Sequence, residues 1–316
     1  MHDIKAKRLF LGICVICIML EYTVATLENP PLYQNTIHRI YFKDSRKMRE
    51  VNDEEVHLVI TSPPYWSIKD YGNPKQIGYR DSLPKYFREL DKVWSECIRT
   101  LKSGCRLCIN IGDQYVRATE KTPYQILPLH ALIVNNLMTK HRDQILYLGS
   151  IIWKKIPNTK TTGGASVMGS YGYPRNGYVS YNYEYIVIFK KKGKAPKVSK
   201  EIKEKSLISL SEWRELFNGI WSFKGAKQVG GIAIFPDTLP HRLMKMFTYE
   251  GDTVLDPFLG SGTTTRVAWE LGRNSIGYEI GFKSPDIENT KKVIKEKIHF
   301  NETPLSERSK VFPTLT

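Results

Sequence analysis

The sequence predicts an α/β protein with a mixed, mostly parallel sheet and helices on both of its faces. Short runs of β-branched residues alternate with segments whose apolar residues recur every three or four positions. Strands that alternate with helices in this way form parallel sheets. A chain of 316 residues, 41% of them apolar, can also bury one large core, with or without a small appended domain.

In the first half of the chain, β-branched and aromatic runs predict four strands. They span residues 38–43, 56–61, 106–111 and 145–154. From Leu83 to Leu101 the apolar residues are spaced by threes and fours, which predicts an amphipathic helix closed by Gly104. A second helix is expected over residues 127–140.

In the second half, strands are expected over residues 183–190, 253–255 and 275–280. A helix is expected over residues 239–247. Another begins at Ser261 or Thr263, carries Val267, Ala268 and Leu271 on one face, and is stopped by Gly272.

The N-terminus carries an apolar stretch, residues 9–20, behind Lys5, Lys7 and Arg8. This pattern resembles a secretory signal, and it is too short to cross a bilayer as a helix. Nothing else in the chain suggests export. We therefore expect a packed N-terminal helix or a start codon placed too early, in a cytoplasmic protein without a membrane partner.

The cysteines and histidines predict neither a disulfide framework nor a metal site. The spacing of Cys14 to Cys17 and of Cys105 to Cys108 looks like two halves of a zinc site. However, the first pair lies in the apolar stretch, and the second lies in a predicted strand, where residues three apart face opposite sides. The seven histidines show no ligand spacing, so we expect reduced thiols.

The charge balance favours a polyanionic partner. The chain carries 47 basic and 32 acidic residues, a formal charge of +15 and a pI near 9.4. Residues 190–232 hold eleven basic residues against four glutamates. We interpret this segment as a small insert that meets DNA phosphates through Lys190, Lys191 and Lys192. A solvated lysine-rich face, in a basic protein without a nucleic-acid partner, is the alternative.

A long glycine-rich segment, residues 157–182, separates two predicted strands. Its tyrosines and Arg175 suit contact with an unstacked nucleotide strand. The alternative is a surface loop without a contact role.

A glycine-bearing turn, DPFLGSGTT at residues 256–264, follows a predicted strand and opens a helix. Gly260 and Gly262 let the backbone approach a ligand, and the helix start offers unpaired N–H donors. Glu279 ends the next strand, 23 residues beyond Asp256. An acidic residue at that spacing grips ribose hydroxyls in nucleotide-binding units. A P-loop is excluded because no Gly-Lys-Ser/Thr follows, and a dinucleotide site is disfavoured because the third glycine is missing.

This turn and the earlier sequence TSPPYW, residues 61–66, resemble the two motifs of β-group DNA amino-methyltransferases. The resemblance implies a Rossmann-like methyltransferase fold with permuted motif order and a small inserted target-recognition region. It also implies S-adenosyl-L-methionine as cofactor, with its ribose on Glu279 and its adenine edge on Asp44. The residues implied around its methionine part are Asp256, Phe258, Gly260, Ser261, Gly262 and Thr263.

The serine in TSPPYW points to the branch that methylates the N4 amine of cytosine in restriction–modification systems. The amine is a poor nucleophile. Two hydrogen-bond acceptors for its protons would assist the transfer of the methyl group to the nitrogen. Ser62 and the carbonyl of Pro63 could serve, because Pro63 and Pro64 keep this backbone stiff. Tyr65 would stack on a cytosine flipped out of the duplex. The open alternatives are adenine N6, whose branch usually has Asp or Asn at the position of Ser62, and a non-catalytic DNA-binding protein.

The expected organisation has five parts. They are an N-terminal extension (1–32), a catalytic half (33–189), the target-recognition insert (190–232), a cofactor-binding half (233–300) and a C-terminal tail (301–316). Double-stranded DNA is the expected substrate, and a cognate restriction endonuclease the expected functional partner.

Overall fold

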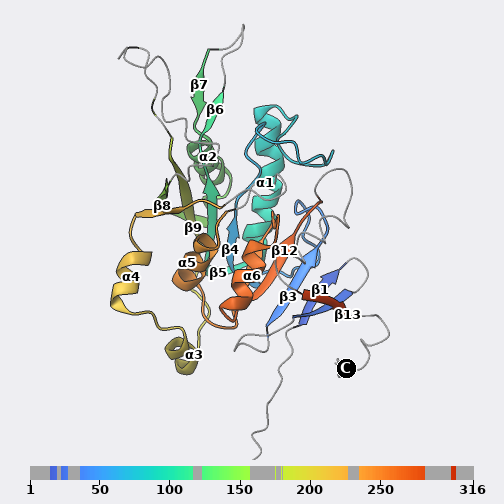
Figure 1. The fold of residues 1–316 in the computed structure, drawn as a ribbon, viewed down its shortest axis with the longest axis vertical. Helices are drawn as coiled ribbons and strands as arrows, with labels where there is room; N and C mark the ends of the chain where they lie inside the picture. Colours follow the sequence, from blue (N-terminus) through green and yellow to red (C-terminus); the bar gives the residue numbers. More distant parts are fainter. Residues whose placement is uncertain are drawn as a thin grey trace, which may run out of the picture.

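The structure, a computed structural model, describes residues 15–19, 23–27, 36–116, 123–156, 175, 179, 181–226, 235–281 and 300–303. In this part of the chain, eleven strands form one sheet in the order β10-β8-β9-β5-β4-β11-β12-β3-β1-β2-β13 (Figure 1). The strands of this sheet are β1 Val15–Met19, β2 Thr23–Leu27, β3 Ile37–Tyr41, β4 Val56–Thr61, β5 Leu101–Ile111, β8 Ile145–Ile156, β9 Tyr183–Lys191, β10 Ile220–Lys224, β11 Thr253–Asp256, β12 Asn274–Tyr278 and β13 Phe300–Thr303. A separate antiparallel hairpin joins β6 (Gln114–Val116) to β7 (Gln125–Leu127).

The centre of the sheet is parallel. The strands β5, β4, β11, β12 and β3 all run in one direction. The strand β9 runs antiparallel to both of its neighbours, β5 and β8, while β10 is parallel to β8. The predicted mixed, mostly parallel sheet is therefore confirmed.

Helices cover both faces of this sheet, as predicted. On one face lie α1 (Leu83–Thr100) and α2 (Leu129–Lys140), and on the other lie α5 (Thr238–Phe247) and α6 (Thr263–Glu270). Two short helices, α3 (Lys200–Lys205) and α4 (Leu210–Leu216), precede β10. Each face of the sheet has its own buried apolar cluster, one centred on Trp94 of α1 and the other on Leu243 of α5.

Local sequence explains where α1 begins and ends. Ser82 caps the helix by accepting a hydrogen bond from the backbone N–H of Lys85, and a proline stands in the first turn. The helix ends at Thr100, and Leu101 already has extended backbone. The prediction that Gly104 closes the helix is wrong. Gly104 lies inside β5 with φ of +79°, where a Cβ atom would meet the backbone nitrogen of Ala195 at 2.3 Å.

The N-terminal apolar stretch is a strand over the residues described, so the predicted packed helix is wrong there. The strand β1 pairs in parallel with β3, and β2 and β13 extend the sheet antiparallel beyond it. Its sequence, Val-Ile-Cys-Ile-Met, is rich in β-branched residues, which suit a pleated sheet better than a helix. None of the helices in the described ranges is long and apolar enough to cross a membrane.

Two of the expected part boundaries fall inside strands of the main sheet. The boundary at residue 190 falls inside β9, and the boundary at residue 301 falls inside β13. The segment 190–232 also contributes β10 to the edge of the main sheet, in parallel with β8. This segment is thus continuous with the sheet, and its role in target recognition stays a prediction.

Candidate functional site

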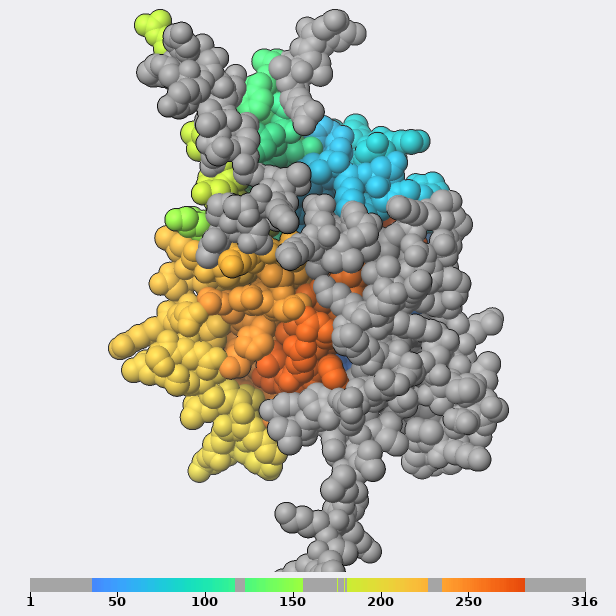
Figure 2. Space-filling view, in the orientation of Figure 1, coloured from blue at the N-terminus to red at the C-terminus, as the bar shows by residue number. Residues whose placement is uncertain are grey.

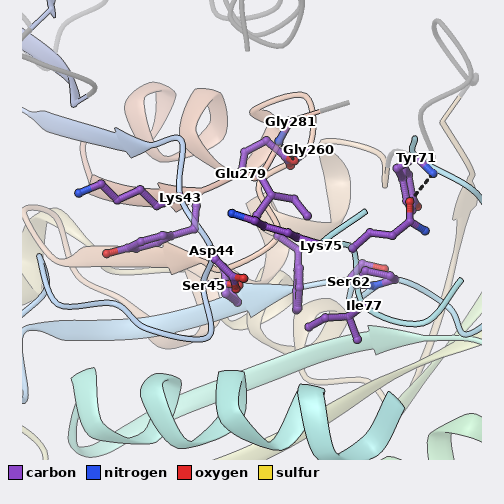
Figure 3. Close-up of a pocket in the computed structure, with 16 residues that line it drawn as sticks. Lys43, Asp44, Ser45, Ser62, Tyr71, Lys75, Ile77, Gly260, Glu279 and Gly281 are labelled. Carbon is purple, nitrogen blue, oxygen red and sulfur yellow. Dashed lines mark hydrogen bonds between the residues drawn. The ribbon is translucent and has the colours of Figure 1, made fainter. Parts of the chain in front are cut away.

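A pocket lies where β3, β4, β11 and β12 end, at the carboxyl edge of the parallel strands (Figure 3). Open α/β sheets bind ligands at this edge. Its volume is about 700 Å³, part of which is open to solvent. The fold brings these predicted site residues into its lining: Asp44, Ser62, Pro64, Phe258, Gly260 and Glu279.

Glu279 is fixed in this pocket by the backbone around it. Its Oε2 accepts a hydrogen bond from the N–H of Gly260 at 2.9 Å, and its Oε1 accepts one from Gly281 at 3.0 Å. Burial raises the pKa of Glu279 to about 7, although these two hydrogen bonds act in the opposite direction. Each oxygen keeps a second lone pair, so the carboxylate can also accept from ligand hydroxyls.

The glycine turn folds as the sequence predicts, because its glycines occupy backbone conformations that other residues avoid. Gly260 has φ of +58°, and Gly262, directly before α6, has φ of +83°. The turn also packs tightly on the next strand. A Cβ atom at Gly277 would lie 2.6 Å from the side chain of Leu259. These contacts hold the turn against β12, at the wall of the pocket.

Asp256 is buried and is absent from the lining of this pocket, and its predicted place beside the cofactor stays a prediction. Its Oδ1 accepts from the hydroxyl of Thr61 and from the N–H of Phe258, both at 3.1 Å, and its Oδ2 accepts from Thr264 at 2.6 Å. Burial raises its pKa to about 6, against the effect of these hydrogen bonds. Asp256 therefore acts as a brace within the protein.

Three further residues of the turn stand behind the pocket rather than in its lining. The side chains of Ser261 and Thr263 are buried, and their hydroxyls lie 3.4 Å apart. Gly262 contributes its conformation as the residue that precedes α6. Of the six residues implied around the methionine part, Phe258 and Gly260 thus line the pocket in this structure.

The TSPPYW turn is held from two sides. The hydroxyl of Tyr86, from α1, donates to the carbonyl of Pro64 at 2.8 Å. The ring nitrogen of Trp66 donates to the carbonyl of Asp81 at the same distance. Pro63 is buried, whereas Ser62 is partly exposed and faces the pocket. The turn therefore presents a serine hydroxyl on a rigid support.

A polar group that the sequence analysis missed lies beside Tyr65. The Nδ2 of Asn110 lies 3.4 Å from the Tyr65 hydroxyl and donates to Glu184 at 2.9 Å, and Lys155 forms an ion pair with Glu184. Burial and the Glu184 carboxylate raise the pKa of the Tyr65 phenol well above its usual range, against a hydrogen bond from Ser62. One signal in the sequence could have revealed this polar group, because Glu184 is a charged residue within a predicted strand.

Asp44 also lines the pocket, next to a loop that the sequence analysis did not single out. Burial alone would raise its pKa, but hydrogen bonds from Arg46 outweigh burial and lower it. The loop contributes Tyr71, Lys75, Gln76 and Ile77 to the lining. Burial and the nearby Glu279 raise the pKa of Tyr71 to about 12. The Asp-Tyr-Gly-Asn-Pro run of this loop is a turn signal that could have found it.

This loop is tied to the segment just beyond β12. The Nδ2 of Asn73 donates to the carbonyl of Ile280, just beyond β12, at 2.7 Å. Gln76 braces the loop internally, because it accepts from the N–H of Tyr71 at 2.7 Å and donates to the carbonyl of Lys69 at 3.0 Å. The pocket is thus bounded by the glycine turn, the TSPPYW turn and this loop.

The lysine run at the end of β9 lies away from the pocket. Since β9 runs antiparallel, Lys190 pairs with Arg106 in the middle of β5, and Arg106 in turn pairs with Leu58 near the start of β4, toward the opposite edge of the sheet. The ammonium of Lys191 has partners within the protein, and its predicted contact with DNA stays a prediction. The ammonium donates to the carbonyl of Leu101 at 2.7 Å and lies 3.3 Å from Glu54. Lys192 is exposed and Lys190 partly so; for both, the DNA contact stays a prediction.

Arg175 is exposed, and its contact with DNA likewise stays a prediction. Most of the glycine-rich segment around it lies outside the described residues. Within the described ranges, no three or more His, Cys, Asp or Glu side chains gather into a group that could hold a metal ion.

Comparison with known proteins agrees with this site. Residues 56–286, which include both turns, match the DNA methylase family N6_N4_Mtase. The chain belongs to this family. The DNA methylase is 37% identical over 294 residues to the type II methyltransferase M.MjaI of Methanocaldococcus jannaschii, covering 83% of this chain and 91% of that one. It is 35% identical over 276 residues to the type II methyltransferase M.MthZI of Methanothermobacter thermautotrophicus, covering 80% and 75%.

A solved structure is similar as well. TTHA0409 of Thermus thermophilus, a provisionally assigned DNA modification methylase complexed with S-adenosyl-L-methionine, superposes with a TM-score of 0.63. The two are 32% identical, and the match covers 83% of this chain and 94% of that one. The predicted Rossmann-like methyltransferase fold is confirmed.

The residues of the pocket fit S-adenosyl-L-methionine, the cofactor of this DNA methylase. The pocket is large enough for a nucleoside and an amino acid. Glu279 keeps lone pairs for the ribose hydroxyls, and Phe258 and Pro64 offer apolar surface. When bound, the cofactor supplies an electrophilic methyl group. The protein is therefore a DNA methyltransferase, and its substrate is DNA.

Proposed function

We propose that this enzyme methylates the N4 amine of a cytosine within a short site in duplex DNA. The observation that carries the proposal is the position of Ser62. Its hydroxyl lines the same pocket as Glu279, on a turn stiffened by Pro63 and Pro64. A substrate amine beside Ser62 would thus lie next to the cofactor.

The amine nitrogen gains a methyl group and in the end releases one proton to solvent, because a neutral hydroxyl or carbonyl can accept a hydrogen bond from the amine but cannot keep its proton. The lone pair of the cytosine amine is delocalised into the ring, so the nitrogen attacks well only when its geometry becomes tetrahedral. An acceptor that takes a hydrogen bond from the amine favours this change, and we assign this role to the Ser62 hydroxyl, which belongs to the pocket lining, and to the carbonyl of the buried Pro63. No side chain has to form a covalent bond with the base.

The target cytosine has to leave the base stack to reach this pocket, because a base inside the duplex is inaccessible. We propose that Tyr65 stacks on the flipped base, since it lies three residues beyond Ser62 on the same turn and the residue is only partly buried. The methyl mark then protects the DNA from a cognate restriction endonuclease. The type II methyltransferases to which the chain is similar support this setting.

The decisive experiment is to identify the modified base. Duplex DNA is incubated with the enzyme and methyl-labelled S-adenosylmethionine, digested to nucleosides and separated by mass and retention. We expect label in N4-methylcytosine. Label in N6-methyladenine would overturn the cytosine assignment and leave the site as it stands. The Ser62→Ala variant, tested in parallel, controls for label that does not depend on this turn.

A further inference from the structure

A row of aromatic rings extends from the catalytic edge of the sheet into the β6–β7 hairpin. The neighbouring ring centroids in this row lie 3.7–6.1 Å apart. We call it the aromatic row, and it consists of His130, Tyr185, Tyr183, Tyr181, Tyr115 and Tyr124. All six side chains are partly exposed rather than buried. The row therefore differs from the apolar core clusters, whose members exclude water.

Hydrogen bonds hold the row in place. The backbone N–H of Tyr181 donates to the hydroxyl of Tyr115 at 2.7 Å, which ties the start of β9 to the hairpin. At the other end, the ring of His130 stacks on Tyr185, and its Nδ1 lies 2.8 Å from Asp113. A preorganised row loses little conformational entropy when it binds a flat partner.

The row lies close to the Ser62 turn. In the sheet register, Tyr185 pairs with Ile111 of β5, and Ile109 of β5 pairs with Thr61 of β4. Adjacent strands are about 4.8 Å apart and successive residues about 3.3 Å, so Tyr185, two strands across and two residues along, lies about 12 Å from the beginning of the turn. From there the row runs outward to the hairpin, which projects at the top of the molecule (Figures 1 and 2).

The charges beside the row suit a phosphate backbone. Lys154 of β8 pairs directly with Tyr183, so both side chains lie on the same face of the sheet, and Lys154 is exposed. The nearby carboxylates are already partnered. Asp113 contacts His130, and Glu184 contacts Lys155. A nucleic acid laid along the row would meet aromatic faces with an exposed ammonium next to them.

We propose that the aromatic row receives the DNA bases that lose their stacking partners when the target nucleotide leaves the duplex. The proposal requires the base pairs next to the target to open as well, so that the partner is unpaired bases beside the target, held on the tyrosines, with a phosphate near Lys154. Every base has a flat face, so stacking on aromatic side chains tolerates any sequence. The proposal rests on base flipping at the Ser62 turn, but it does not depend on whether the base is cytosine or adenine.

The test compares two DNA probes that carry no assumption about the recognition sequence. One is a short duplex with a central bubble of unpaired thymines, and the other is the same duplex fully paired. The wild-type enzyme should bind the bubble more tightly. Stacking contributes about 1–3 kcal/mol per base, so losing one stacked base should weaken bubble binding about 5- to 150-fold.

The variants are Tyr183→Ala and Tyr181→Ala, each paired with its Phe substitution, which keeps the ring. We expect the alanine variants to lose the preference for the bubble and the phenylalanine variants to retain it. Lys154→Ala should weaken binding to both probes and flatten the dependence of log K on log salt by about one. The control is Tyr249→Ala, an exposed tyrosine between α5 and β11, which should bind like the wild type.

Cofactor binding and thermal melting report whether each variant folds. If an alanine variant does not fold, Lys154→Ala and the phenylalanine variants still decide the question. An undiminished bubble preference in folded Tyr181→Ala and Tyr183→Ala, or a salt dependence unchanged in Lys154→Ala, overturns the proposal. The product assay described above tests the proposed function separately, because it reads the modified base and not the affinity.

Discussion

The hydroxyl of Thr61 donates a hydrogen bond to Oδ1 of Asp256 at 3.1 Å, although the two residues are 195 positions apart. Thr61 is the last residue before Ser62, and Asp256 begins the glycine turn. The strands β4 and β11 that carry them are neighbours in the sheet. This bond fixes the spacing between the turn assigned to the substrate and the turn assigned to the cofactor. Methyl transfer needs that spacing to be correct within a fraction of an ångström.

The main expected effect of replacing Asp256 is therefore a loss of stability. Asp256→Ala leaves three buried donors without their acceptor, which should lower the free energy of unfolding by about 3 kcal/mol. Asp256→Asn keeps an oxygen for Thr61 and Phe258, and the Thr264 hydroxyl can turn to accept, so its loss should be smaller. Urea denaturation measures both. Equal free energies of unfolding for the two variants would contradict this structural role of Asp256.

Cofactor affinity should depend on pH through Glu279. Burial raises its pKa to about 7, and ribose hydroxyls donate best to the ionised carboxylate. Affinity should therefore rise from about pH 6 to about pH 8, by at most about tenfold per unit below the pKa. The stability of the cofactor-free protein depends on pH in the opposite direction. Because the folded pKa lies above the unfolded one, the contribution of Glu279 to stability decreases as pH rises from about 4.5 to about 7.

Calorimetric titration of S-adenosylmethionine at several pH values measures this effect. Glu279→Gln has nearly the same size but does not titrate, so its affinity should be weaker and flat across the range. A wild-type affinity that is the same at both ends of the range would show that Glu279 does not hold the ribose.

Ser62→Ala should lower kcat and leave cofactor affinity near normal. The hydrogen bond from the amine strengthens as the nitrogen changes geometry, so its loss affects the transition state more than the bound states. Losing one positioned hydrogen bond that strengthens in the transition state costs about 10²–10³ in rate. Single-turnover methylation and cofactor titration separate the two quantities. Ser45→Ala, another serine of the pocket lining, is the matched control and should retain its rate. Full activity of Ser62→Ala would rule out the mechanism.

Lys191 and Lys192 should behave differently even though they are adjacent. Lys191→Ala removes a part-buried ammonium that donates to Leu101 and pairs with Glu54, which should cost about 1–3 kcal/mol of stability. The salt dependence of DNA binding should not change in this variant. Lys192→Ala should leave stability unchanged and, if Lys192 meets a phosphate, flatten the salt slope by about one. Denaturation and binding at several salt concentrations distinguish the two roles.

Elements with a strong local pattern were predictable from the sequence. The strand Val56–Thr61 and the start of α1 at Leu83 were predicted to the residue, because β-branched runs, apolar spacing and caps are local signals. The N-terminal strand β1 was not predicted, since a short apolar run fits a buried helix and a buried strand equally well. The antiparallel direction of β9 depends on distant pairing, which no local pattern reveals.

The same distinction between local patterns and contacts of distant segments applies to the residues of the site. The meeting of Gly260 and Glu279 followed from the spacing of a turn, a helix and a strand. The inward direction of Asp256 did not, because it is set by the hydroxyl of Thr61 from another strand. The ammonium of Lys191 turned inward for a similar reason, since its acceptors lie on β5 and before β4. Spacing predicts which backbones meet, but side-chain directions depend on partners far along the chain.

The hydrogen bond from Asn73 to the carbonyl of Ile280 has a consequence for turnover. It ties the loop, which contributes Tyr71 and Lys75 to the pocket lining, to a residue just beyond β12. If the cofactor exchanges on this side of the pocket, the loop has to open before a fresh molecule can enter. Opening of the whole loop, in which this hydrogen bond is one contact, would then be a step in the exchange of the demethylated cofactor. Exchange of that product, rather than the methylation step, would limit the rate at which successive sites are modified.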